Sequence, residues 1–518
     1  MQGFLARHAS QITGVLRGPD RMILRGYLQM LATPGGMKSF LDRARVPLAR
    51  FRAYVLDVTC KLIAASLVKA VTLERPVIYL SSAATRKEDV ARRVLDENPV
   101  DEGLICVLKA VEPCKTYDLK GSRRGGHVWL ESKYGKCLHL YHYFLDRQFG
   151  FMSARIQTWF PFTIQIWVNG REWLQRRFIA EGVRDYVKEE NCFTRLRDVE
   201  QAQELFDRML DTSWQPALDE IAQRVNPIHR EIFALAPQTY YWSLFQSEWA
   251  VDVLFKDASY LQSLFPGLAR HAITQMSCAD VLRYLGRKAD GRFQGEILGD
   301  FKSRAEGLRV KHWVDGNSLK AYVRGHGHVL RGEFTMNHPD GFKVYRPKRG
   351  AEGEAYAWQP LRKGVADLYR RAQVSDQAVG RYLDGLAAVE QQTPLKDLLD
   401  DLCRPVRWHG RRFRALSPLS EKDARLLEAV NRGEFAANGF RNRDLLPLLE
   451  LGTARTQQER RRRSAKVTRV LALLRAHSLI RKVPGTHRYL VTTQGKLEIT
   501  AALAARQASV AKLVANAA

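Results

Sequence analysis

Acidic residues at two places in the sequence have the chemistry and spacing to bind a divalent metal ion. Asp20 lies at the edge of a short predicted strand, where a carboxylate is either a turn residue or a metal ligand. Glu248 and Asp252 are four residues apart in an aromatic segment, 240–252, that we expect to be helical, so both would lie on one face. Carboxylate oxygens are the ligands that Mg²⁺ and Mn²⁺ prefer. The alternative for this pair is an ordinary solvated face.

A second set of candidate residues lies in residues 308–335, where polar and apolar residues alternate. Glycine-containing turns divide this stretch into a predicted β-meander, with Tyr322 in its second strand and Glu333 in its third. A phenol of pKa about 10 is a poor nucleophile, but a divalent cation on the attacked phosphate compensates. The alternative is that Tyr322 is one more cross-strand aromatic residue.

The same stretch resembles part of the rolling-circle replication initiators of plasmids. Residues 317–322 read Asn-Ser-x-Lys-x-Tyr, and residues 330–333 read Leu-Arg-x-Glu. The resemblance implies that Tyr322 attacks DNA and that Glu333 is a metal ligand or a base. The candidate catalytic residues are therefore Tyr322, Glu333 and Asp20. The candidate ligands of Mg²⁺ or Mn²⁺ are Glu248, Asp252 and Glu333.

Positive charge is concentrated near the C-terminus, in residues 451–490, which contain a single acidic residue, Glu459. The whole chain has a net charge of +27 and an isoelectric point near 9.9. Such a surplus predicts a polyanionic partner, most often a nucleic acid. A membrane surface is disfavoured because the charge accompanies aromatic residues and hairpins and not one long amphipathic helix.

Residues 420–500 contain the elements that position this charge. Their pattern predicts a helix capped by Ser420, a short helix from Asn442, a third helix over residues 464–477, and a hairpin over residues 479–491. Three helices followed by a basic hairpin resemble the winged helix-turn-helix of MarR-like transcription regulators. The resemblance implies that the third helix enters the major groove and that the hairpin, or wing, lies on the DNA backbone.

Two groups of residues are then expected to contact nucleic acid. In the winged helix, base edges are assigned to Arg469, Lys466 and Ser464 with Arg462 beside them, and phosphates to Arg481, Lys482, His487 and Arg488. Residues 404–414 predict a short basic hairpin whose arginines suit phosphates and whose aromatic rings suit unpaired bases. Its candidate residues are Arg407, Trp408, Arg411 and Arg412. A purely structural hairpin is the alternative.

Other features of the composition exclude several classes of protein. No apolar run is long enough to predict a transmembrane helix, and the N-terminus lacks the pattern of a secretory signal. The seven cysteines are odd in number and form no Cys-x-x-Cys pair, which predicts a reducing cytoplasm and no cysteine zinc site. A phosphate-binding Gly-x-x-x-x-Gly-Lys loop is absent from the sequence, so ATP or GTP hydrolysis is not expected.

The fold expected from these patterns is α/β (α+β) and multidomain, with a mixed or antiparallel sheet in its N-terminal body. The expected parts are an α/β domain with an aromatic-rich sheet (1–175), a helical region (176–290), a β-meander that completes the body (291–347), a helical connector (348–400), and the basic hairpin with the winged helix (401–518).

The function expected from the sequence is nucleic-acid binding, with duplex DNA bound through the C-terminal winged helix of a mobile-element or replication-type DNA-processing protein. Three alternatives remain open. The first is a MarR-like transcriptional regulator without catalysis, which implies a homodimer. The second is a metal-dependent nickase, nuclease or recombinase. The third is a protein that binds structured RNA. No membrane partner is expected.

Overall fold

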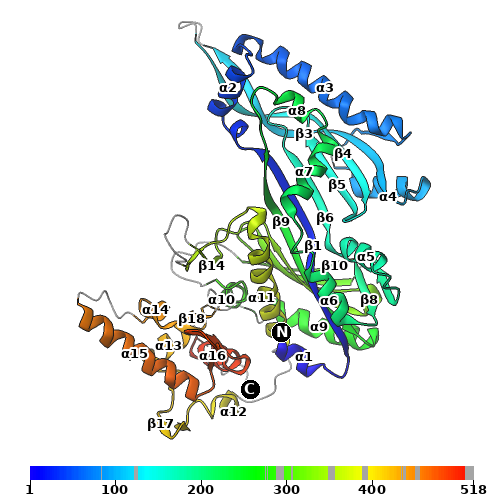
Figure 1. The fold of residues 1–518 in the computed structure, drawn as a ribbon. Helices are drawn as coiled ribbons and strands as arrows, with labels where there is room; N and C mark the ends of the chain where they lie inside the picture. Colours follow the sequence, from blue (N-terminus) through cyan, green and yellow to red (C-terminus); the bar gives the residue numbers. More distant parts are fainter. Residues whose placement is uncertain are drawn as a thin grey trace.

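A large mixed sheet with helices packed on it forms most of the chain, and a smaller unit carries the C-terminus (Figure 1). The computed structural model describes residues 1–82, 84–121, 127–274, 276, 278–287, 297–304, 307–347, 356–387, 395–432, 435, 439–449 and 456–507. These residues include both predicted chemical sites. The α/β class with a mixed sheet, expected from the sequence, is confirmed.

Among the described residues, eleven strands form the large sheet, in the order β10-β11-β12-β13-β9-β1-β6-β5-β4-β3-β2. Neighbouring strands are antiparallel except β2 and β3, which are parallel. The strands are β1 (Ile12–Leu28), β2 (Val77–Leu80), β3 (Gly103–Gly121), β4 (Val128–Asp146), β5 (Gly150–Gln157), β6 (Ile164–Asn169), β9 (Tyr240–Phe255), β10 (Leu298–Arg304), β11 (Gly307–Val314), β12 (Asn317–Arg324) and β13 (Val329–Met336).

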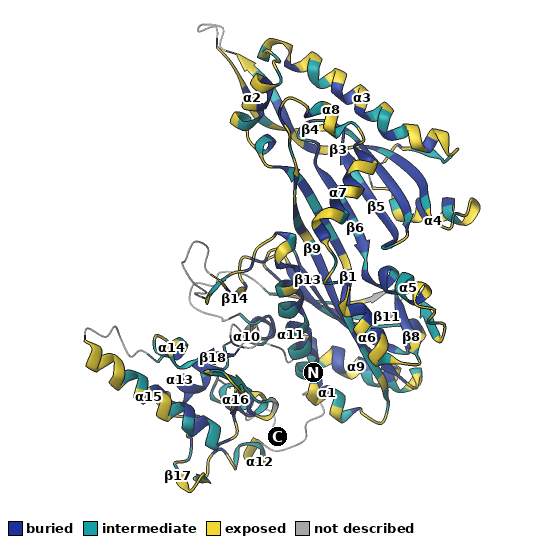
Figure 2. Cartoon of the chain, viewed as in Figure 1, coloured by how far each residue is buried: buried dark blue, intermediate teal, exposed yellow. Residues whose placement is uncertain are grey.

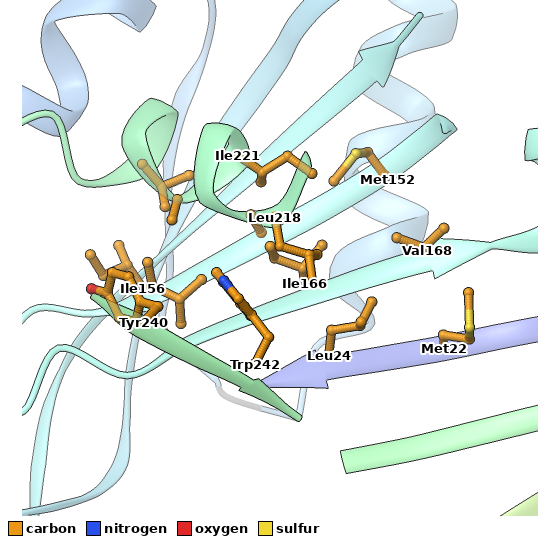
Figure 3. Packing of buried hydrophobic residues seen from close by; sticks show 14 of the residues in the cluster. Met22, Leu24, Met152, Ile156, Ile166, Val168, Leu218, Ile221, Tyr240 and Trp242 are labelled. Carbon is orange, nitrogen blue, oxygen red and sulfur yellow. The ribbon is translucent and has the colours of Figure 1, made fainter. Parts of the chain in front are cut away.

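The long strands β1 and β9 lie side by side in the middle of the sheet and contribute to two hydrophobic cores. Met22 and Leu24 of β1 and Trp242 of β9 belong to the first core, which is shown from close by in Figure 3. Val251 and Val253 of β9 belong to the second. In both cores, apolar side chains that alternate along the strands pack against apolar side chains of the helices that cover that side of the sheet. Figure 2 shows the resulting band of buried strands.

Helices cover the two cores at opposite ends of the sheet. α2, α3 and α7 pack over the β3–β6 end, whereas α9 and α11 pack over β9 and β11–β13. The contact of α11 with β13 is close, because a Cβ atom on Gly332 would lie 2.7 Å from a methyl group of Val379. The helices of this region are α1 (Gln2–Arg7), α2 (Pro34–Arg43), α3 (Phe51–Thr72), α4 (Lys87–Glu97), α5 (Gly170–Ala180), α6 (Val199–Asp207), α7 (Trp214–Val225), α8 (His229–Ile232), α9 (Ala258–Thr274), α10 (Cys278–Tyr284) and α11 (Leu368–Ala387).

The prediction of a helix over residues 240–252 is wrong, because this segment is the strand β9. Its aromatic and β-branched residues favour a strand, and residues four apart lie on one face of a strand as they do on a helix. The expected helical region 176–290 also contains β7 (Tyr186–Glu189) and β8 (Cys192–Leu196), which form a separate hairpin. Of the expected connector 348–400, residues 348–355 and 388–394 lie outside the described part of the chain.

In its described residues, the C-terminal unit contains a short hairpin, five helices and a three-stranded sheet around its own core. Leu427, Leu471 and Leu474 are central to that core. The elements are α12 (Leu395–Leu399), β16 (Val406–Trp408), β17 (Arg411–Phe413), α13 (Glu421–Val430), β18 (Phe440–Arg441), α14 (Asn442–Leu445), α15 (Gln457–Ala476), β19 (Ile480–Lys482), β20 (Arg488–Val491) and α16 (Thr493–Gln507). The Ser420 cap and both predicted hairpins are confirmed. The third predicted helix begins earlier than expected, because Thr456 caps it.

The hairpin of β14 (Lys343–Pro347) and β15 (Tyr356–Pro360) connects the C-terminal unit to the body of the protein. Trp358 of β15 packs against the C-terminal core. The guanidinium of Arg488 lies 4.0 Å from the ring centre of Tyr345, and Arg443 donates a hydrogen bond of 3.0 Å to the Tyr345 hydroxyl. Tyr345 of β14 therefore contacts both β20, through Arg488, and α14, through Arg443.

Candidate active site and nucleic-acid interface

Three buried carboxylates from three adjacent strands meet near the centre of the large sheet. They are Asp20 of β1, Glu248 of β9 and Glu333 of β13. One oxygen from each lies within 4.8 Å of the others. The sequence pointed to each of these acids separately, and the pairing of the strands brings them together.

The register of the strands explains how the three acids converge. β9 lies between β1 and β13, and Glu333 pairs with Ala250, so Glu333 is diagonal to Glu248. On the other side, Pro19 pairs with Trp249 and Met22 with Ser247. Two residues of β1 therefore lie opposite Glu248 alone, which is a β-bulge. The bulge directs Asp20 toward the other two carboxylates.

Tyr322 of β12 lies directly against this cluster. Its hydroxyl donates a hydrogen bond of 2.5 Å to Oε2 of Glu333, while Lys320 forms an ion pair with Oε1 of the same carboxylate. Burial opposes the ionisation of Glu333, but Lys320 and then the Tyr322 hydroxyl outweigh it and hold the pKa of Glu333 at about 2. Burial and the Glu333 charge raise the pKa of Tyr322 well above 10. The pair is thus a phenol that donates to an ionised carboxylate.

Glu248 has the opposite electrostatic character. Burial, followed by the charge of Glu333, raises the pKa of Glu248 above its usual range, although nearby cations oppose the shift. Arg21 and Gln246 each donate a hydrogen bond of 3.0 Å to Oε1 of Glu248. The Arg21 side chain is half exposed, so its charge is partly screened by water. Burial and the neighbouring carboxylates therefore disfavour the ionised form of Glu248.

Asp252, which was predicted as a metal ligand alongside Glu248, is not one of the clustered carboxylates. Arg171 and Arg331 both donate to its carboxylate, at 2.8 Å and 2.6 Å, and all three side chains are buried. Burial opposes the ionisation of Asp252, but these two guanidiniums hold its pKa below its usual range. Arg331 also donates to Asp20, at 3.2 Å. Asp252 therefore supports the arginine that positions Asp20.

The cluster suits a hard divalent cation. Its donors are carboxylate oxygens from three strands, and Mg²⁺ and Mn²⁺ bind such oxygens in preference to softer ligands. Burial and then the charge of Glu333 raise the pKa of Glu248, so a cation held by the three acids would favour its ionised form. Asp20, Glu248 and Glu333 would hold the ion. Asn191 donates a hydrogen bond of 2.8 Å to Oδ1 of Asp20 and would orient it.

Sequence reasoning missed the residues that surround the cluster on the same side of the sheet. Glu333 pairs with Lys320, and Lys320 pairs with Lys311, so these side chains point to one side, which we call the polar face. Lys311 lies 3.8 Å from the ring centre of Trp313, whose side chain is 44% exposed. Burial, and then Lys320, lower the pKa of Lys311 to about 8. The alternation in residues 308–323 already placed these residues on one side.

The predicted third helix presents most of its candidate residues to solvent. Arg462, Lys466 and Arg469 of α15 are exposed. Ser464 is half-buried and donates a hydrogen bond of 3.3 Å to Asn442. Ser464 therefore joins α15 to α14 and is not directed outward.

The β19–β20 hairpin and the basic β16–β17 hairpin also contain both exposed candidate residues and candidate residues that pack against the protein. Arg481, Lys482 and His487 of the wing are exposed, whereas Arg488 lies on the Tyr345 ring. The exposed residues of the basic hairpin are Arg407, Arg411 and Arg412. Trp408 is half-buried, and the guanidinium of Arg475 lies 4.6 Å from its ring centre. Arg488 and Trp408 thus have packing roles within the protein.

Comparison with models of protein families, with curated proteins and with solved structures finds no match to this chain. In the part of the chain that the structure describes, no helix has both the length and the apolar character needed to span a membrane.

Proposed function

We propose that the protein is a metal-dependent DNA-processing enzyme that breaks a DNA strand with Tyr322 at the Asp20–Glu248–Glu333 cluster. The observation that carries the proposal is the hydrogen bond from the Tyr322 hydroxyl to Glu333, one of three carboxylates whose oxygens lie within 4.8 Å of one another. A phenol, the carboxylate that accepts its hydrogen bond and two further carboxylates thus lie together, and these groups would serve as nucleophile, proton acceptor and metal ligands.

The chemistry of the strand break follows from these contacts. The Tyr322 oxygen attacks phosphorus, its proton passes to Oε2 of Glu333, and the bond from phosphorus to one sugar oxygen breaks. The sugar oxygen takes a proton from water, and the strand end remains joined to Tyr322 as a phosphodiester. A bound Mg²⁺ or Mn²⁺ would withdraw charge from the attacked phosphate and make the phenol a sufficient nucleophile. Lys320 would stabilise the negative charge that develops at the phosphate.

We propose further that the C-terminal unit binds duplex DNA as a winged helix. The order α13, α14, α15 and the β19–β20 hairpin supports this, as does the exposure of the cationic residues on α15 and on the wing. Arg469 and Lys466 would contact base edges, and Arg481 and Lys482 would contact phosphates. The setting would be a mobile-element or replication-type process in a reducing cytoplasm, which the seven unpaired cysteines suit.

The test is a cleavage assay with labelled single-stranded and duplex DNA, with structured RNA for comparison, in Mn²⁺ and in EDTA. The wild type should leave label covalently on the protein in Mn²⁺, and Tyr322→Phe should leave none. Tyr141→Phe is the matched control, because the buried Tyr141 hydroxyl also donates to a buried glutamate, Glu112, at 2.7 Å. If the wild type binds DNA but leaves it intact in every condition, the protein binds DNA without cleaving it. If it retains RNA in preference to DNA, its partner is RNA.

A further inference from the structure

A cavity of about 600 Å³ opens next to the carboxylate cluster. It is bordered by the ends of β1 and β9, by β3, by the loop before β6, and by the turns at residues 316 and 337–338. This volume lies in the range of pockets that enclose small organic ligands. Its lining includes Arg25, Tyr27, Phe245, Gln246 and Asn337.

The cavity is connected to the cluster through Gln246. This residue lines the cavity and donates a hydrogen bond of 3.0 Å to Oε1 of Glu248. Ile23 pairs with Gln246 and Arg25 pairs with Ser243, so Arg25 and Gln246 point to the same side of the sheet as Glu248. A DNA strand bound on the polar face at the cluster would therefore extend along β9, from Glu248 to the cavity beside Gln246.

The charged residues that line the cavity are the cations Arg25, Lys115 and Lys363. Nε of Arg25 is buried, and no described residue accepts a hydrogen bond from it. Burial, followed by the nearby Arg155, lowers the pKa of Arg25. Lys115 and Lys363 are exposed at the same cavity. An anion beside Arg25 would restore the interactions that burial removes.

The other walls suit a planar ring with polar edges. Phe245 projects at a bulge of β9 and is 49% exposed, and Tyr27 packs edge-on against Tyr241. The amide of Asn337 is fixed by a hydrogen bond of 2.6 Å that its Nδ2 donates to the Gly316 carbonyl. Aromatic rings stack on nucleobases, and side-chain amides hydrogen-bond to their edges.

We propose that this cavity holds one nucleotide of the substrate strand, with its base between the aromatic residues and Asn337 and its phosphate on Arg25. The proposal rests on the proposed function and adds to it a subsite that selects the base beside the cleaved bond. An apolar ligand would leave Arg25 without an anion, and a free phosphate would leave the aromatic walls without a partner.

The first measurement is the binding of fluorescent 12-nucleotide homopolymers of dA, dC, dG and dT in EDTA, by anisotropy, to the full chain. The wild type should bind one of them about tenfold more tightly than the weakest, and Tyr27→Ala or Asn337→Ala should reduce this ratio to about threefold or less. Tyr79→Ala is the matched control, because Tyr79 is an exposed tyrosine on the edge strand β2. It should retain the wild-type ratio.

The second measurement uses the wild type alone and does not depend on how any variant folds. Strands that carry 5-iodouracil are cross-linked by light, and the modified peptide is identified by mass spectrometry. Cross-links at Tyr27 or Phe245 support the subsite. Cross-links only at Trp313 or Trp408, or equal binding of all four homopolymers, overturn it while leaving strand cleavage by Tyr322 intact. Failure of every strand to bind would overturn both the subsite and the proposed function.

Discussion

Replacing Glu248 with glutamine should stabilise the metal-free protein and remove its response to metal. The substitution keeps the volume of the side chain and removes one of three charges whose oxygens lie within 4.8 Å of one another. At an effective dielectric constant of about 20, each carboxylate repels Glu248 by about 3 kcal/mol or more. Lys320, at 4.0 Å from Glu248, offsets about 4 kcal/mol of this repulsion, and the half-exposed Arg21 offsets about 1 kcal/mol at most.

The remaining repulsion makes the metal-free variant more stable by about 1 kcal/mol, once a weaker hydrogen bond from Gln246 is allowed for. In the wild type, a metal ion at 100 times its dissociation constant adds about 2.7 kcal/mol to the free energy of unfolding. For a chain of 518 residues, that gain corresponds to a rise of about 2–3 °C in the melting temperature, because the entropy of unfolding grows with chain length. The variant should show less than about a third of this rise, because one of its three anionic ligands is lost.

Differential scanning fluorimetry of EDTA-dialysed protein, followed by titration with Mn²⁺, measures both effects. Glu112→Gln is the matched control, because Glu112 is a buried carboxylate of the same sheet that is neutralised by Lys87 and Arg155. It should lower the stability of the metal-free protein by about 1–3 kcal/mol and keep the full response to Mn²⁺. If Glu248→Gln behaves like Glu112→Gln in both respects, the cluster is not a metal centre.

Three further predictions concern the interior, the pH dependence and the C-terminal unit. Asp252→Asn should cost about 3–5 kcal/mol in urea unfolding, because it leaves two buried guanidiniums without their anion; a cost below 1 kcal/mol would contradict this. Because the folded-state pKa of Glu248 is raised, its ionisation destabilises the protein at neutral pH, and protonation relieves this as the pH falls. The response to Mn²⁺ should therefore fade at a pH above 4.5 and not below it. In anisotropy titrations, Arg481→Ala should weaken every duplex alike and lower the salt slope by about 1, whereas Arg469→Ala should cost about 1–3 kcal/mol at a preferred sequence only; an equal loss on every duplex would refute these roles.

The sequence predicted those parts of the fold that depend on local patterns. Alternation over residues 308–335 placed Tyr322 and Glu333 on neighbouring strands, and the described register pairs Tyr322 with Arg331, two residues before Glu333. Turn residues and a helix cap were sufficient for the C-terminal elements. Alternation, turn residues and helix caps each depend on residues close together in the sequence, so these elements could be predicted without knowing which distant strands pair.

Features that depend on distant pairing could not be predicted in this way. Asp20 and Glu333 are brought together by strands far apart in the sequence, and the bulge that turns Asp20 into the cluster exists only when β1 pairs with β9. The same holds for Asp252, whose two arginines come from α5 and β13. Residues 240–252 were predicted to be a helix because residues four apart lie on one face in a helix and in a strand alike. Only the pairing of this segment with β1 and β13 shows that it is a strand.

The central position of β1 in the sheet has a consequence for how the protein is made. β1 ends at Leu28, but its partner β9 begins at Tyr240, and the last ligand strand, β13, ends at Met336. At a synthesis rate of about 5–20 residues per second, β1 waits about 10–40 s for β9 to leave the ribosome. During that interval one edge of a 17-residue strand is unpaired and open to other chains. A nascent chain shorter than 333 residues also lacks Glu333, so an unfinished copy of the protein has no complete carboxylate cluster.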